Sequence, residues 1–214
     1  MTAQPRRAAP EAAVAMRQNP HDAVGGAKGE PRHRLPGVEG VWVFIFADMA
    51  VFAVMFGCFM ADRRQNLELF EASRQALNLD FGGINTLILL TSSMLVVLAI
   101  DAIKQGRQRL ASNFFGLAAA CGAAFIVCKA FEYSQKFDAG IGLQSNDFFM
   151  YYFIMTGMHL GHVAVGTVIV AVLAFRSRFV PEGVSLAAGE GGATYWHMVD
   201  LLWVCMFPLL YLVR

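Results

Sequence analysis

Ionisable side chains inside long apolar segments most constrain what this chain can fold into. Six of them stand in four of the five such segments: Asp48, Glu132, His159, His162, His197 and Asp200. A charged group at the centre of a bilayer costs at least about 2.5 kcal/mol, so such groups normally face protein or water and mark a function. We therefore take these six residues as the candidate functional residues.

The apolar segments themselves predict the fold class. Hydrophobic residues make up 57% of the chain and charged residues only 15%, which is typical of a protein that crosses the membrane several times. Each segment reaches the length of a membrane-spanning helix, and the five ranges are 40–61, 83–104, 113–134, 148–175 and 193–213. We expect an all-α bundle of five transmembrane helices. The net charge of +1 gives no sign of a nucleic-acid partner.

The region before the first segment has a different composition. Residues 1–36 are rich in Ala, Pro, Gly and Arg and contain no apolar run, so we expect a disordered tail followed by one transmembrane domain over 37–214. If the tail is cytoplasmic, eleven Lys and Arg residues lie inside and five outside. By the positive-inside rule, the N-terminus is expected in the cytoplasm.

Counting from the expected helix ends, at about 1.5 Å per residue, sorts the polar side chains by depth. The expected groups are an inner group of Asp48, His197 and Asp200, a midplane pair of His159 and His162, and an outer pair of Lys129 and Glu132. Glu132 and Asp200 are then too far apart to bind one metal ion. A smaller metal site around the two midplane histidines stays open, although histidines in packed helices more often hydrogen-bond across helices.

Other residues are expected to shape helix packing. Gly157 and Gly161 form a GxxxG spacing, which lets a neighbouring helix approach closely. Asn85 and Ser92 lie on one side of the second segment and can hydrogen-bond to another helix. Because unpaired buried charge is costly, we expect Asp48 to contact the last helix or a lipid headgroup beside it, or to be partly protonated.

Taken in order, the motifs resemble subunit III of the haem-copper oxidases. The resemblance covers nearly everything after the tail. It is carried by residues 40–49 (GVWVFIFADM), 84–93 (INTLILLTSS), 131–133 (FEY), 156–163 (TGMHLGHV) and 195–203 (YWHMVDLLW). The chain is similar to the shorter, five-helix form, which lacks the first two of the seven helices in longer members.

The resemblance implies a subunit with no redox cofactor of its own. Such a subunit packs against catalytic subunit I, which holds the haem and copper, in the inner membrane of bacteria. It binds phospholipids and supports proton uptake and sustained turnover. The six candidate residues would then have lipid-related or proton-related roles. Asp48 falls where many longer members carry a carbodiimide-reactive glutamate.

Three readings of the function follow. The first is an accessory subunit of a respiratory haem-copper oxidase or nitric oxide reductase complex. Residues 146–150 (NDFFM) and the compact first loop look most like the branch associated with nitric oxide reductases, so the substrate of the catalytic partner can be O2 or NO. A stand-alone transporter or proton channel is one alternative, because carboxylates and histidines in a membrane suit a proton relay. A membrane metalloenzyme with a histidine site is the other.

Overall fold

The part of the chain described by the computed structural model, residues 39–213, is built of helices. Its elements are α1 (Glu39–Gln65), α2 (Leu67–Gln75), α3 (Leu79–Lys104), α4 (Gln108–Asp138), α5 (Asp147–Phe179), α6 (Leu186–Phe207) and the π-helical turn η1 (Pro208–Leu212). Within these residues, five helices are long and apolar enough to cross a membrane. The predicted all-α, five-span fold is therefore confirmed. The expected tail over 1–36 lies outside the described residues.

Every transmembrane helix begins or ends beyond its predicted limits. The largest difference is in α6, which begins at Leu186 instead of at 193. Glycine has a low helix propensity, so the glycines in the first residues of α6 disfavour a helix there. In the structure, however, these glycines let α6 pack closely against its neighbours. A Cβ on Gly189 would lie 3.1 Å from Ile100 Cδ1 of α3, and a Cβ on Gly192 would lie 2.7 Å from Leu173 Cδ1 of α5. Tertiary contacts thus override the local propensity.

Glycines end two of the long helices. Gly106 after α3 and Gly140 after α4 both have a φ of 72°, a left-handed conformation that costs glycine little. After α3, the amide of Arg107 donates to the carbonyl of Ala102 at 2.9 Å. This bond, with the one from Gly106 N–H to Ile103, is the pattern of a Schellman motif, which satisfies carbonyls left free at a helix end.

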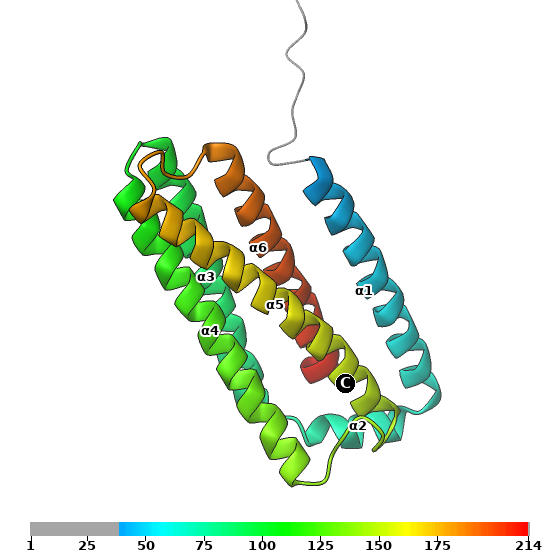
Figure 1. Ribbon diagram of the computed structural model, residues 1–214. Coiled ribbons are helices and arrows are strands. Elements are labelled where there is room, and N and C mark those ends of the chain that lie inside the picture. Colours follow the sequence, from blue (N-terminus) through cyan, green and yellow to red (C-terminus); the bar gives the residue numbers. More distant parts are fainter. Residues whose placement is uncertain (1–38, 214) are drawn as a thin grey trace, which may run out of the picture. The chain divides into compact units, whose positions relative to one another are not determined.

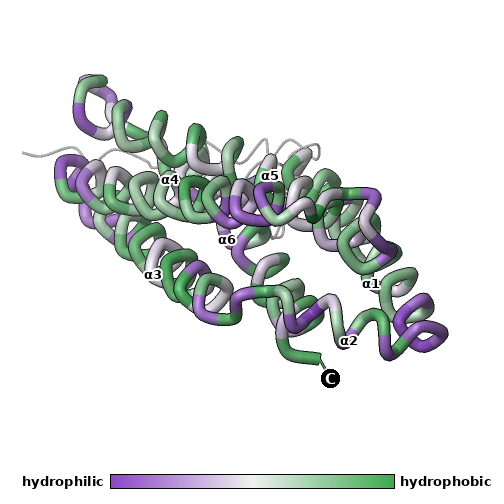
Figure 2. The backbone as a smooth tube through the Cα atoms, turned by 90° about the horizontal axis from the view of Figure 1, so that it is seen from below, coloured by the Kyte–Doolittle hydropathy of each residue, from purple (hydrophilic) through white to green (hydrophobic). Residues whose placement is uncertain are grey.

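The helices form a bundle in which sequence neighbours pack side by side (Figure 1). α3, α4 and α5 follow one another through short turns, and α6 packs against both α3 and α5. α1 packs against α5 and α6 at one side of the bundle. Hydrophilic residues gather near the helix ends and along α2, while the long helices are mostly hydrophobic (Figure 2). This distribution suits a bundle that crosses a membrane.

The short helix α2 was not predicted, because nine residues are too few for a reliable pattern. It runs across the end of the bundle (Figure 1), held there by aromatic contacts. The ring of Phe70 lies edge-on to Phe59 of α1 at 5.4 Å and to Phe148 of α5 at 5.7 Å. Next to them, Tyr151 donates a hydrogen bond to Asp62 Oδ2 at 2.6 Å. This end of α1 is therefore fixed to α2 and α5.

Close helix contacts occur at glycines other than the GxxxG pair. Trp196 of α6 is buried against α4 and α5, where a Cβ on Gly122 or on Gly166 would lie 2.8 Å from its ring. In contrast, a Cβ on Gly161 would meet nothing within 4 Å, and one on Gly157 only a tyrosine oxygen at 3.9 Å. Within residues 39–213 no helix approaches Gly157 and Gly161 closely, so the expected close approach at this pair stays a prediction.

Candidate functional site

A buried ion pair forms the polar centre of the bundle. Lys129 and Glu132 of α4 are only 1% and 2% exposed, and Lys129 Nζ donates to Glu132 Oε2 at 2.8 Å. Tyr152 of α5 and Tyr211 of η1 each donate to Glu132 Oε1 at 2.8 Å. The carboxylate thus accepts three hydrogen bonds, and the pair links α4, α5 and the end of the last span.

The ammonium group of Lys129 is also well surrounded. It donates a second hydrogen bond to the Tyr211 hydroxyl at 3.1 Å. It also lies 4.8 Å from the centre of the Trp203 ring, with Tyr152 and Tyr211 at 5.4 and 5.5 Å. Aromatic faces attract cations, and most strongly where water is excluded. These rings and hydroxyls take the place of water around a charge pair that is otherwise costly to bury.

The sequence placed Glu132 close to the end of its helix, and the structure corrects this helix end. α4 continues to Asp138, so Glu132 lies about 9 Å from the helix end at 1.5 Å per residue. Tyr152 and Tyr211 were not singled out from the sequence. A signal existed, because a tyrosine hydroxyl buried in an apolar segment needs a polar partner.

A second polar contact joins α1 to α5. His162 Nε2 lies 3.2 Å from Asp48 Oδ1, and the His162 ring is near the rings of Phe44 at 6.3 Å and Phe52 at 6.0 Å. The other carboxyl oxygen of Asp48, Oδ2, is buried without a hydrogen-bond partner among the described residues. Asp48 is therefore a half-satisfied carboxyl group beside a histidine whose ring lies near two phenylalanine rings.

This pairing bears on two expectations about Asp48. Its ion-pair partner is His162 of α5, which was expected at the midplane. Its neighbours Ile45 and Met49 border the same groove as His197 of α6, so the expected grouping of Asp48 with His197 and Asp200 stays a prediction. The depth count assumed that all helices end level with one another. However, α5 has 33 residues and α1 has 27, so their ends cannot coincide and residues counted to different depths can meet.

The two histidines of α5 have different surroundings. His159 is fully buried, its ring stacked on Trp203 at 5.3 Å and edge-on to Phe125 at 5.7 Å. Neither of its ring nitrogens has a hydrogen-bond partner among residues 39–213. His162 instead pairs with α1. Within the described part of the chain, no three His, Cys, Asp or Glu side chains gather in a way that could hold a metal ion.

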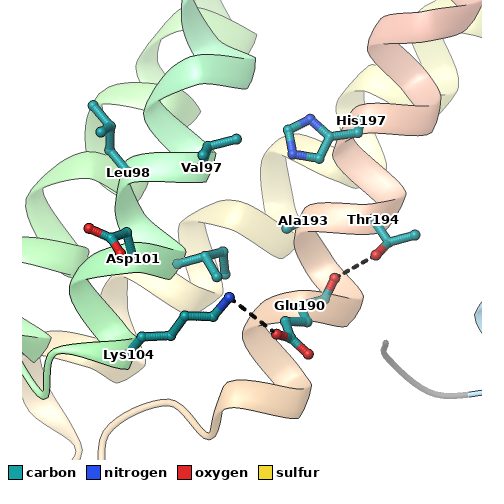
Figure 3. A pocket seen from close by; sticks show the side chains of 9 residues that line it. Val97, Leu98, Asp101, Lys104, Glu190, Ala193, Thr194 and His197 are labelled. Atoms are coloured by element: carbon teal, nitrogen blue, oxygen red, sulfur yellow. Dashed lines mark hydrogen bonds and ion pairs between the residues drawn. The ribbon is translucent and has the colours of Figure 1, made fainter. Parts of the chain in front are cut away.

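A third polar contact joins α3 to α6. Ser93 Oγ and His197 Nδ1 lie 2.6 Å apart. Asp200, one turn along α6, is buried, and its Oδ1 has no hydrogen-bond partner in residues 39–213. His197 also borders a cavity between the two helices, and it lies farther along α6 than Thr194 and Glu190 (Figure 3).

The polar residues of α3 were expected to hydrogen-bond to another helix, and some of them do. Ser92 Oγ donates to the carbonyl of Ala118 in α4 at 3.1 Å. Thr86 accepts a hydrogen bond from Trp203 Nε1 of α6 at 2.9 Å. Asn85 is fully buried, but neither of its amide atoms has a partner in the described chain. The residues thus face two neighbouring helices, α4 and α6, instead of one.

An apolar groove lies between α1 and α6. Its volume is about 450 Å³. Most of its lining is hydrophobic, and the residues are Trp42, Ile45, Phe46, Met49, Thr194, His197, Met198 and Leu201. Two of these side chains, Thr194 and His197, also line the cavity between α3 and α6, so the two hollows lie on either side of α6.

Comparison with known proteins identifies similar sequences over nearly the whole described region. Residues 34–213 match the family model of cytochrome c oxidase subunit III. Cytochrome c oxidase subunit 3 of Thermostichus vulcanus is 31% identical over 89% of this chain and 92% of its own length. The subunit 3 of Alkalihalophilus pseudofirmus is 30% identical over 89% of this chain and 97% of its own length. A haem-copper oxidase subunit I+III of Aeropyrum pernix is 30% identical over 82% of this chain and 22% of its own length.

Proposed function

The chain belongs to the cytochrome c oxidase subunit III family, and we propose that it is a non-catalytic accessory subunit of a respiratory haem-copper oxidase or nitric oxide reductase complex in a bacterial inner membrane. The observation that carries the proposal is the use made of its intramembrane polar groups. Lys129, Glu132, His162 and Ser93 all bind side chains of neighbouring helical elements. Such contacts between helices make the bundle rigid, and a rigid bundle can hold a neighbouring catalytic subunit in place.

The catalytic partner is a subunit I-like protein that carries the haem and copper. The relative from Aeropyrum pernix supports this, because its name describes subunits I and III in one chain. Fusion keeps two parts together at high effective concentration. The structure offers large apolar helix surfaces for such a partner, including exposed residues of α3 such as Leu87, Met94 and Val97.

The proposed proton-related role centres on Asp48. This carboxyl group is buried, lies in a membrane-spanning helix and has one oxygen free of hydrogen bonds among the described residues. Ionisable groups in such places are candidates for proton relays. We infer that Asp48 and His162 support proton uptake by the partner, with His197 and Asp200 serving the same end on the other side of α6.

Bound phospholipid is the second part of the proposed role. The groove between α1 and α6 is apolar, about 450 Å³ in volume, and formed by helices that cross a membrane. An acyl chain fits its lining chemically. A lipid held there would fill the space between α1 and the bundle and would limit access of water to the neighbouring subunit.

The experiment compares complexes with and without this chain at equal haem content. The initial rate and the half-life of inactivation during turnover are measured with O2 and with NO as substrates. We expect deletion to leave a substantial initial rate, to shorten the half-life and to slow proton uptake. Asp48→Leu should reproduce part of this defect. Asp80→Leu, which changes an exposed acid at the start of α3, is the matched control.

Three results would contradict the accessory role. Complete loss of initial activity with the haems intact would show that the chain takes part in the reaction. An unchanged rate, lifetime and assembly would remove the supporting role and favour a stand-alone transporter. A metal ion bound in stoichiometric amount by the purified chain, and lost in His159→Ala and His162→Ala, would favour the metalloenzyme instead.

A further inference from the structure

The contact between Ser93 and His197 has a direction. Ser93 Oγ of α3 lies 2.6 Å from His197 Nδ1 of α6, and the same hydroxyl is a hydrogen-bond partner of the Asp200 carboxyl. A hydroxyl carries a single proton, and an ionised carboxylate can only accept. Ser93 therefore donates to Asp200, and His197 donates to Ser93 from Nδ1. The three side chains form one line of hydrogen bonds that ends at a buried acid.

The second ring nitrogen of His197, Nε2, then has a free lone pair. A neutral imidazole holds its proton on one nitrogen only, and the other nitrogen is an acceptor. His197 borders the cavity between α3 and α6, which has a volume of about 470 Å³. Its ring points from α6 into the space between the two helices, toward Val97 (Figure 3). A water molecule in this cavity can therefore give a proton to His197.

This cavity has a charged border at one boundary of the bilayer. Lys104 Nζ of α3 lies 3.8 Å from Glu190 Oε1 of α6, and the two side chains face each other in Figure 3. Lys104 is the last residue of α3, and Glu190 lies in the second turn of α6. α1 begins at the same end of the bundle (Figure 1). Water thus enters from the side on which α1 begins, which is expected to be the cytoplasm.

The line of hydrogen bonds lies deep in the membrane. Ser93 is eleven positions from the end of α3, and His197 is eleven positions from the start of α6, so both lie about 16 Å inside at 1.5 Å per residue. Asp200 is one turn deeper and buried, and its Oδ1 has no hydrogen-bond partner in residues 39–213. A charged carboxylate is costly in such a place. A bound proton removes that charge.

We propose that Asp200 is a proton-binding site, loaded through His197 and Ser93 from the cavity between α3 and α6. A hydronium ion in the cavity gives a proton to His197 Nε2 and becomes water. Nδ1 releases its own proton to the Ser93 oxygen, and Ser93 passes its hydroxyl proton to the Asp200 carboxylate. Asp200 is left as a neutral acid, Ser93 as a hydroxyl and His197 as a neutral ring protonated on Nε2. The reverse steps return the proton to the cavity.

Such a line stores one proton instead of conducting many. After one transfer, His197 carries its proton on Nε2 and cannot pass on a second one until the first has returned. Among the described residues, the next hydrogen bond between the two helices runs from Trp203 Nε1 to Thr86. Thr86 is about 10 Å from Ser93 along α3 at 1.5 Å per residue, which is beyond hydrogen-bond reach. The stored proton therefore leaves by the way it came.

Ionisable side chains of the other helices packed on α6 are engaged elsewhere. His162 of α5 lies 3.2 Å from Asp48 of α1, and His159 of α5 stacks on Trp203 at 5.3 Å. On α3, Asp101 stands at the border of the cavity with the charged pair. The cavity between α3 and α6 thus controls exchange at the buried acid. Use of the stored proton by a catalytic partner rests on the proposed function.

The test uses the full-length chain, with any partners that accompany it, inserted into vesicles in one orientation. Infrared difference spectra are recorded after the pH is changed on one side only. A protonated carboxyl group has a carbonyl stretch that a carboxylate lacks, so loading of Asp200 appears as a new band. Turnover is not measured, so the accessory role can fail while the band is present, and the band can be absent while the accessory role holds.

Wild-type protein should gain the band when the pH falls on the side on which α1 begins, and not when it falls on the other side. Asp200→Asn should lose the band, whereas Asp80→Asn, which changes an exposed acid of α3, should keep it. His197→Phe and Ser93→Ala should slow its appearance about a hundredfold, the lower end of what a positioned proton-transfer group contributes.

Three outcomes would overturn the proposal. The first is an equal spectrum for wild type and Asp200→Asn, which would mean that Asp200 takes up no proton. The second is loading from the opposite side of the membrane. The third is an unchanged rate in both His197→Phe and Ser93→Ala, which would mean that the proton takes another route. The sidedness is measured on the wild type, and asparagine keeps the size of aspartate, so loss of the fold does not obscure these results.

Discussion

Replacing Lys129 by methionine tests whether the buried ion pair holds the bundle together. Methionine has a similar length and fills the same space, but it has no charge. The substitution removes the hydrogen bonds from Nζ to Glu132 at 2.8 Å and to Tyr211 at 3.1 Å. It also removes the cation from the Trp203 ring. Glu132 is left as an unpaired carboxyl group within the bundle.

The expected loss of stability follows from these contacts. Breaking a buried ion pair by removing one partner typically costs about 3–5 kcal/mol, because the other charge stays buried. Here Tyr152 and Tyr211 still donate to Glu132, so we expect the lower end, about 3 kcal/mol. Removing both charges, in Lys129→Met with Glu132→Gln, leaves no unpaired charge. The double variant should therefore be more stable than the sum of the single changes predicts.

The measurement is reversible unfolding in mixed micelles, followed by tryptophan fluorescence. Trp203 is a suitable reporter because its ring lies 4.8 Å from Lys129 Nζ. The control is Lys104→Met. Its side chain is 54% exposed and lies 3.8 Å from Glu190, and partly exposed pairs contribute at most about 1 kcal/mol. The two lysine variants thus differ in burial and not in chemistry.

The reasoning fails if Lys129→Met costs less than about 1 kcal/mol, the size of an ordinary interhelical hydrogen bond in a membrane. It also fails if the two single changes simply add in the double variant. Either result would mean that Lys129 and Glu132 do not stabilise each other.

Three further predictions concern packing, α1 and topology. Gly166→Ala should lower the stability of the fold by about 1–3 kcal/mol, because its Cβ would lie 2.8 Å from the Trp196 ring. Gly161→Ala, with open space around the new Cβ, should leave the melting temperature nearly unchanged. Equal effects of the two substitutions would contradict the packing described here. Asp48→Leu should speed amide hydrogen exchange in α1 but not in α4, since it removes the contact to His162, and unchanged exchange in α1 would show that this contact does not hold the helix. Reporter fusions at the two ends of the chain should lie on opposite sides of the membrane, with the N-terminal one in the cytoplasm; fusions on the same side would contradict five spans.

The number of membrane-spanning helices could be predicted because each apolar run matches the thickness of a bilayer. Their ends could not, since a helix continues past the hydrocarbon wherever its neighbours support it. α5 illustrates this, because it runs to Phe179 through Arg176 and Arg178. The short helix α2 depends on contacts of Phe70 with two other helices, which no local pattern shows.

The candidate residues could be identified from the sequence, but not their partners. The pairing of Asp48 with His162 depends on how far α1 and α5 are displaced along each other. The contact between Tyr211 and Glu132 depends on the π-helical turn that follows Pro208. Helix rotation and stagger are tertiary properties, so a count of residues from each end does not contain them.

The partners of the buried ion pair lie in spans that are synthesised at different times. Lys129 and Glu132 lie in the third span, but Trp203 and Tyr211 belong to the fifth. While the earlier spans enter the bilayer, Glu132 has Tyr152 and lacks its second tyrosine. Each new molecule therefore passes through a stage with an incompletely surrounded charge pair. A chain that lacks the fifth span thus keeps Lys129 and Glu132 without the side chains of Trp203 and Tyr211.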